Sequence, residues 1–237
     1  MKVKIIALLL TAAHCAYGAL AIDVATGGCD NSTTVSVSAT VTPGAYVVVG
    51  ITPGYSGTIS SIDCTGATCS FTQKSDWVSG PPGRTYSMAN APSGITAIVA
   101  TFSATALHCL VVSSFTGAAT ASAEDSSPVT ITDSAASDVV TDSIVTTCAD
   151  TALVAIYNIA DVPTVGVPSS GWIDIGGANG YSGGHHKVAG SYRIVSSAST
   201  YTDTRTLSAA KDYHSTAWAI KADTCTPAAR RKVFLVQ

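Results

Sequence analysis

The sequence predicts an all-β protein, a two-sheet antiparallel sandwich of the jelly-roll or lectin-like kind. Apolar and polar residues alternate in short runs, as in residues 34–39 and 129–132, and a period of two is the pattern of a half-buried strand. Clusters of Pro and Gly separate the runs at regular intervals, as turns do. The body of the chain lacks apolar residues at helical spacing, so we expect strands throughout.

The first 21 residues have the three zones of a secretory signal. Lys2 and Lys4 form the basic end, residues 5–13 are apolar, and small residues lead up to Ala21. Cleavage after Ala21 fits the small-residue rule best, and Gly18 is the alternative. An apolar run of about ten residues is too short for a membrane span, which needs roughly 20. We therefore expect a secreted, extracytoplasmic protein with no stable membrane span.

The cysteine count indicates disulfides. Six cysteines remain once Cys15 leaves with the signal, and an even number in an exported chain favours cross-links over metal ligands. Cys64 and Cys69 flank a four-residue loop with Gly66 at its turn, which predicts a bridge across a tight hairpin. Six cysteines allow 15 pairings, and the other four stay open. The pairs we favour are Cys64–Cys69, Cys148–Cys225 and Cys29–Cys109. A second C-x-x-C or a suitably spaced His pair is missing, so no metal site is predicted.

Charge excludes one class of partner. All 15 acidic residues lie between Asp23 and Asp223, whereas five of the 12 basic residues lie in the signal or at residues 230–232. The body therefore carries seven basic residues against 15 acidic ones, and an acidic surface repels phosphate backbones. We expect no nucleic-acid binding.

The order of landmarks favours two similar halves, at about residues 38–118 and 142–222. Each half has, in order, an apolar strand (45–50; 152–157), a tryptophan (Trp77; Trp172), an aromatic strand (84–88; 191–195) and a closing apolar strand (107–115; 216–221). Related halves are expected to share one core, with equivalent strands interleaved between two sheets. The plan is a signal peptide at 1–21, a sandwich domain at 22–224 and a C-terminal tail at 225–237.

This order resembles a β-sandwich module that recurs in secreted and virion-associated proteins of environmental bacteria and their phages. The resemblance covers about residues 33–222. The motifs that carry it are A-x-V-V-V at 45–49, S-F-T-G-A at 114–118, A-L-V-A at 152–155, S-G-W at 170–172 and A-W-A-I-K-A at 217–222. The resemblance implies a jelly-roll-like sandwich used in display, adhesion or surface assembly. It implies no active residues.

Two short segments are similar to the catalytic segments of trypsin-like serine proteases. Residues 10–15 (L-T-A-A-H-C) match the surroundings of that family's histidine, and residues 180–184 (G-Y-S-G-G) those of its nucleophile. His14, however, lies inside the signal, and Tyr181 stands where the family has an acidic residue. We predict no catalytic residue and no cofactor.

The Gly-rich loop at 176–186 is the candidate ligand-binding segment. Tyr181 offers a ring for stacking on a sugar, and His185 and His186 offer two imidazoles. Neighbouring strand residues point to opposite faces, so both histidines bind one ion only on an irregular backbone. The alternative is a long polar connection.

The three tryptophans divide between core and surface. Trp218 lies in an apolar alternating strand and is expected in the core. Trp77 and Trp172 adjoin loops, where they either form a stacking platform for carbohydrate or pack against the edge of the sandwich. Their matching places in the two halves favour packing.

These observations predict a non-enzymatic sandwich that works through its surface, in adhesion or carbohydrate binding, with glycans or a cell or virion surface as partner. The first alternative is a structural subunit of a virion or extracellular filament that self-assembles by strand pairing at its edges. The second is a glycoside hydrolase, which needs two carboxylates about 5 to 9.5 Å apart in a cleft. Asp174, Asp203 and Asp212 are the candidate carboxylates, and their spacing singles out no pair.

Overall fold

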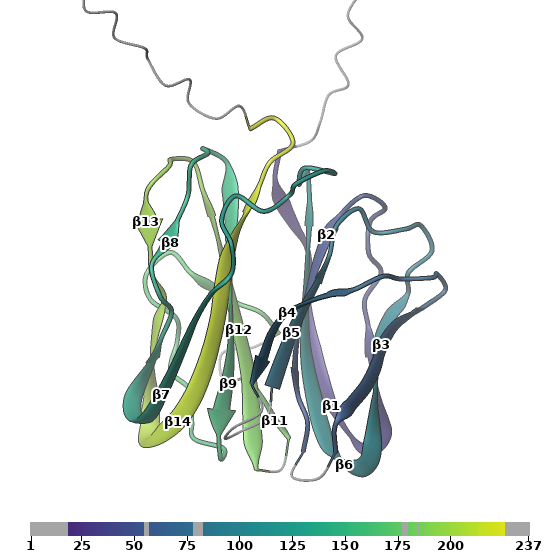
Figure 1. Cartoon of the computed structure of the whole chain (residues 1–237), viewed down its shortest axis with the longest axis vertical. Helices are drawn as coiled ribbons and strands as arrows, with labels where there is room; N and C mark the ends of the chain where they lie inside the picture. The colour runs from purple at the N-terminus through teal and green to yellow at the C-terminus, as the bar shows by residue number, and fades with distance from the viewer. Residues whose placement is uncertain (1–18, 55–56, 78–82, 177–179, 184, 226–237) are drawn as a thin grey trace, which may run out of the picture.

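The structure is a computed structural model that describes residues 19–54, 57–77, 83–176, 180–183 and 185–225. All regular secondary structure in these residues is β-strand. Most of the strands form two antiparallel sheets that face each other (Figure 1). The predicted all-β sandwich is confirmed. Residues 1–18 of the predicted signal and residues 226–237 of the predicted tail lie outside the described residues.

The first sheet is built from the first half of the chain. Its strands are β1 (Ala21–Ser38), β2 (Tyr46–Thr52), β3 (Ile59–Thr65), β4 (Thr72–Trp77), β5 (Gly83–Met88) and β6 (Ala97–Thr116). The strand order is β1-β6-β2-β5-β4, and β3 pairs with the first part of β6. β6 is longer than the closing apolar strand that the sequence predicted at 107–115, because it also includes the apolar run that ends at Phe102. The polar residues between those two apolar runs do not interrupt it.

The second sheet is built from the second half. Its strands are β7 (Val129–Val140), β9 (Thr151–Ala160), β10 (Ile173–Asp174), β11 (Tyr181–Gly183), β12 (His186–Val195) and β14 (Thr204–Lys221), and a separate pair is formed by β8 (Ile144–Val145) and β13 (Thr200–Tyr201). The strand order is β10-β12-β9-β14-β7, with β11 paired to β12.

The two sheets have the same strand order. The order β1-β6-β2-β5-β4 of the first sheet corresponds, strand for strand, to the order β7-β14-β9-β12-β10 of the second. Even β3 has a counterpart, because Val165 bridges to Leu207 of β14 as β3 pairs with β6. Each half starts at its own edge strand, so the halves are 21–116 and 129–221. The predicted repeat omitted β1 and β7.

The predicted interleaving of equivalent strands is wrong, because each half forms its own sheet. The halves share one apolar core between the sheets, to which β2 and β6 contribute Val48 and Phe115, and β9 and β14 contribute Ile156 and Trp218. Each half also has a second core on the outer face of its sheet. β2 is therefore buried along its whole length and β9 along all but its last residue, which explains their continuous rather than alternating apolar runs.

The outer core of the first half is closed by long strands that bend. β1 pairs with β6 along both strands, and the register shifts between Ser32 and Thr34. Beyond this bulge, the last residues of β1 and the first residues of β6 form a layer with β3. This layer covers β2 and β5, since Val35 of β1 and Ile98 of β6 pack with Val49 of β2 in one cluster. Bulges permit such bends by adding a residue to one strand.

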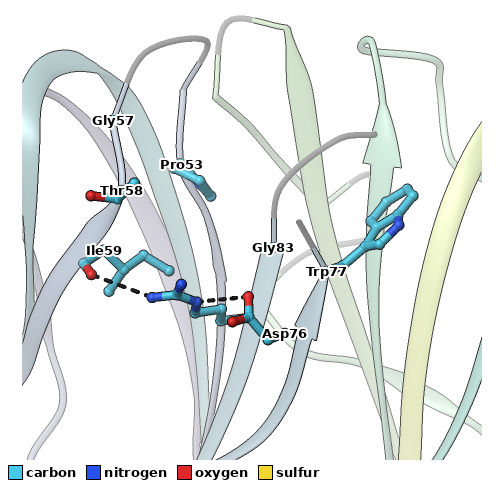
Figure 2. A pocket seen from close by; sticks show the side chains of 8 residues that line it. Pro53, Gly57, Thr58, Ile59, Asp76, Trp77 and Gly83 are labelled. Atoms are coloured by element: carbon cyan, nitrogen blue, oxygen red, sulfur yellow. Dashed lines mark hydrogen bonds and ion pairs between the residues drawn. The ribbon is translucent and has the colours of Figure 1, made fainter. Parts of the chain in front are cut away.

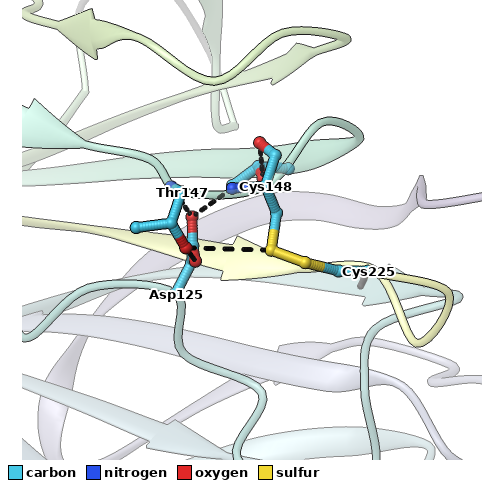
Figure 3. Close-up of a disulfide and its surroundings, with 5 residues drawn as sticks. Asp125, Thr147, Cys148 and Cys225 are labelled. Carbon is cyan, nitrogen blue, oxygen red and sulfur yellow. Dashed lines mark hydrogen bonds between the residues drawn. A yellow bond between two sulfur atoms is a disulfide. The ribbon is translucent and has the colours of Figure 1, made fainter. Parts of the chain in front are cut away.

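The structure forms the three disulfides that the sequence favoured. Cys29–Cys109 joins directly opposed residues of β1 and β6, Cys64–Cys69 closes the turn after β3, and Cys148–Cys225 joins the start of β9 to the end of β14. Figure 3 shows Asp125 beside the third bridge, where its carboxylate accepts hydrogen bonds from the backbone N–H groups of Thr147 and Cys148. Three disulfides are typical of extracellular proteins.

The start of the fold bears on the two predicted cleavage positions. Leu20 is buried in the core between the sheets, and Ala21 already pairs with Thr116. Cleavage after Ala21 would remove a core side chain, whereas cleavage after Gly18 would keep it. The packing therefore favours the second position.

Candidate functional site

Several irregular connections between strands lie at one end of the sandwich, which we call the loop end (Figure 1). Of the described residues, it comprises 53–54 and 57–58 after β2, 77 at the end of β4, 83 at the start of β5, 160–163 after β9, and 175–176, 180–183 and 185–186 around β11. Both ends of the described chain lie at the opposite end, where Leu20 and Thr224 line one cavity. The loop end is therefore the part of the fold farthest from residues 19 and 225.

A cavity of about 240 Å³ opens at the loop end of the first half (Figure 2). One wall comes from the β2–β3 connection and the start of β3, and the other from the facing ends of β4 and β5. The lining residues are Pro53, Gly57, Thr58 and Ile59 on the first wall, and Asp76, Trp77, Gly83 and Arg84 on the second.

An ion pair lies on the second wall of this cavity, and its cation reaches across to the first wall. Arg84 Nε donates to Asp76 Oδ1 at 2.9 Å, and Arg84 Nη1 donates to the carbonyl of Ile59 at 3.3 Å. Asp76 lies directly across the β4–β5 hairpin from Arg84, so strand pairing brings the two charges together. The hydrogen bond to Asp76 raises the pKa of Arg84 above its usual range, and the guanidinium stays charged. Both side chains are partly exposed, 25% for Arg84 and 34% for Asp76.

The matching position of the second half is closed. Lys187 is the second residue of β12, as Arg84 is of β5, and its Nζ donates to the carbonyl of Pro163 at 2.6 Å. In both halves, then, a cation reaches from the sheet to a carbonyl in the connection that leads to the outer layer. Lys187 is only 2% exposed, and burial lowers its pKa. Both halves have a cation at this position, but it is partly exposed to solvent in the first half and buried in the second.

Trp77 belongs to the contact between the halves. Figure 2 shows its ring turned away from the ion pair, and it stacks on His214 of β14 with ring centroids 5.4 Å apart. Beside it, Thr216 Oγ1 donates to Ser75 Oγ at 2.7 Å, a hydrogen bond from one half to the other. His214 Nε2 lies 3.2 Å from Thr216 Oγ1, and burial lowers the pKa of His214. Trp77 therefore packs rather than offering a stacking platform.

Trp172 is also buried. It is 6% exposed within the outer core of the second half, and its Nε1 donates to the carbonyl of Thr202 at 3.0 Å. A ring held in this way has no free face for a sugar, so the ligand-binding interpretation of Trp172 is corrected to a packing role. Trp218 is fully buried between the sheets, as predicted.

Tyr181 lies at the loop end but is not free. Its hydroxyl donates to the carbonyl of Gly176 at 2.7 Å, and its ring packs against the core between the sheets. The ring lies so close to Gly27 of β1 that a Cβ at that position would overlap it. Tyr181 therefore helps join β11 to the first half, and only part of its ring remains accessible.

His185 and His186 have different surroundings, as the alternation argument anticipated. His185 is exposed in the turn before β12, whereas His186 is half-buried at the start of that strand. Burial lowers the pKa of His186, and the neighbouring His185 lowers it further. Among the described residues, no group of three or more His, Cys, Asp or Glu side chains could hold a metal ion.

The three aspartates proposed for a hydrolase do not meet in a cleft. Asp203 is fully buried and lies 3.6 Å from Arg205, and the same guanidinium is 2.6 Å from Asp174. Tyr157 and Ser191 donate to Asp203 as well. Asp212 is in the middle of β14, where it accepts a hydrogen bond from the backbone of residue 135. This arrangement stabilises a core and leaves no room for a substrate.

Sequence reasoning missed Asp76 and Arg84. The segment that contains Asp76 had no strand prediction, and Arg84 was noted only as part of an aromatic strand. The available signal was the pair of opposite charges eight residues apart on either side of a Pro-Gly turn, which is the spacing of a hairpin pair.

Comparisons of the chain with protein-family models, with curated proteins and with solved structures gave no match. The resemblance to a phage and bacterial sandwich module therefore stays a prediction. Within the described residues, no helix is long and apolar enough to cross a membrane.

Proposed function

We propose that this protein is an exported, non-enzymatic surface-binding module, which attaches to a cell or virion surface through its loop end. The observation that carries the proposal is that connections from both halves meet at the end farthest from residues 19 and 225. A sandwich that presents loops at one end of a rigid scaffold is a common design for binding proteins.

The scaffold behind the loops supports this role. A core shared by the halves fixes one set of loops relative to the other, and disulfides anchor strands in both halves. Binding groups attached to a preorganised scaffold lose less conformational entropy when they bind, which favours affinity. Three cross-links also suit a protein that works outside the cell.

The alternative of assembly by edge pairing has less support. The edge strands are β1 and β4 in the first sheet and β7 and β10 in the second. The pairing of β1 shifts register near Ile22 and Ser32, and the pairing of β7 shifts twice. Bulges and edge charges such as Asp30 and Asp138 hinder the addition of another strand. An edge built in this way favours a soluble module over a filament subunit.

The test compares matched surface variants in a binding assay. The purified, disulfide-bonded chain is labelled and applied to panels of bacterial cells, virions and immobilised glycans. His185→Glu places a charge at an exposed position of the loop end, and Val145→Glu places one at an exposed position of β8, outside the loop end.

We expect His185→Glu to weaken surface binding and Val145→Glu to leave it unchanged, because only the first lies in the proposed contact. Equal binding by both variants, or a loss confined to Val145→Glu, would contradict the use of the loop end. Size-exclusion chromatography with light scattering accompanies the assay, and ordered large assemblies of the unmodified chain would favour the filament subunit instead.

A further inference from the structure

The cavity of the first half has the features of a small ligand site. About 240 Å³ is enough for one small ring, and Arg84 is partly exposed beside this space whereas its counterpart Lys187 is buried. The cavity is lined on one side by the apolar side chains of Pro53 and Ile59 and on the other by the Arg84–Asp76 ion pair.

The charges at the cavity favour a neutral ligand. Arg84 and Asp76 compensate each other at 2.9 Å, so neither an anion nor a cation gains from the net charge. Both groups still have hydrogen-bonding capacity, since a guanidinium carries five N–H groups and a carboxylate accepts at two oxygens. A ligand with two neighbouring polar groups could accept a hydrogen bond from Arg84 with one group and donate a hydrogen bond to Asp76 with the other.

We propose that this cavity binds a neutral pyranose unit of a surface glycan through two adjacent hydroxyl groups. One hydroxyl accepts from Arg84 and the next donates to Asp76, while the C–H face of the ring lies against Pro53 and Ile59. This inference rests on the proposed function and names the ligand class and the residues for it. It replaces the tryptophan platform that the sequence suggested, because both Trp77 and Trp172 are buried.

The ion pair of the second half supplies a matched control. Lys211 and Asp161 form an exposed pair at the same end of the molecule, so Asp161→Asn removes a similar charge outside the cavity. Asp76→Asn keeps the shape of the side chain at the cavity and removes the acceptor charge. Neither variant alters a buried charge.

The probes are methyl pyranosides of glucose, galactose, mannose and fucose, and their 2-deoxy or 3-deoxy analogues. Binding to the full disulfide-bonded chain is measured by saturation-transfer NMR and titration. We expect at least one intact pyranoside to bind and its deoxy analogue, which lacks one of the two hydroxyls, to bind at least about tenfold more weakly. A hydrogen bond to a charged group is worth a change of that order.

Asp76→Asn is expected to weaken the same sugar at least about tenfold, and Asp161→Asn to leave it unchanged. Absence of binding by any pyranoside would overturn the inference, as would binding that survives Asp76→Asn in a protein with an unchanged circular dichroism spectrum. Binding only of sulfate or of galacturonate would overturn it too, because it would show an anion site. Surface attachment that persists in Asp76→Asn but is lost in His185→Glu would overturn the sugar site alone and keep the proposed function.

Discussion

The two halves share a strand order but fill their outer cores differently. In the first half, Ile98 and Ala100 of β6 point into an apolar cluster. In the second half, the start of β14 and the residue before it point Arg205 and Asp203 inward, where Arg205 meets Asp174. The outer core of the second half therefore combines an apolar cluster with a buried charge network, which one topology accepts provided that the charges compensate each other.

The largest expected effect on the free energy of unfolding comes from the buried charge network, which, among the described residues, only the second outer core contains. Arg205→Met should lower the free energy of unfolding by about 3–5 kcal/mol, because Asp203 would remain buried without its cation. Adding Asp203→Asn to this variant should restore much of the loss. Urea unfolding of the three proteins measures both changes, and a loss below about 1 kcal/mol for Arg205→Met would show that the network does not hold the second core.

The two disulfides of the first half test whether stabilisation follows the length of the loop that each bridge closes. Replacing Cys29 and Cys109 by Ala should cost about 2–4 kcal/mol, since the bridge spans 80 residues. The Cys64–Cys69 bridge spans only five residues, and the chain-entropy argument makes its removal about 2 kcal/mol less costly. Thermal unfolding of the two double variants gives the comparison, and equal losses would contradict the loop-length explanation.

A smaller effect concerns pH. Burial lowers the pKa of His108 in the first half and of His214 between the halves. The unfolded chain then binds more protons once the pH falls below about 6.5, so the free energy of unfolding decreases there, by at most about 1.4 kcal/mol per pH unit for each histidine. Above that pH, these two histidines do not make the free energy of unfolding depend on pH.

The variant His214→Gln isolates the contact between the halves. Urea midpoints at pH 7.5 and 5.5 should differ less in His214→Gln than in the unmodified chain, because one of the groups that take up protons is gone. A pH dependence that stays the same would mean that His214 does not titrate with unfolding.

Periodicity predicted most of the fold because most strands have at least one apolar face. The strands that contain Val35 and Val47 were found from alternation or continuous apolar runs, and the tryptophan landmarks located the repeat. The sequence did not reveal the inward direction of Asp203 and Arg205. They alternate with threonines in a polar segment, a pattern that indicates an exposed strand until tertiary contacts are known.

The candidate site was harder to predict than the fold. Tyr181, His185 and His186 do lie at the loop end, because the Gly-rich segment joins the edge of the second sheet. Asp76 and Arg84 come together only through the β4–β5 hairpin, and the cavity beside them depends on the separate position of β3. Distances between layers are not encoded in any local pattern.

The central claim about the ligand is that the sugar site lies in the cavity of the first half, within a loop end to which both halves contribute. Amide hydrogen exchange of the full chain, with and without the tightest-binding pyranoside, tests this most directly. We expect slower exchange at residues 57–59 and 83–85 on sugar binding, and no change at 160–163 and 186–189. Slower exchange at the second set, or no change at the first, would contradict the account.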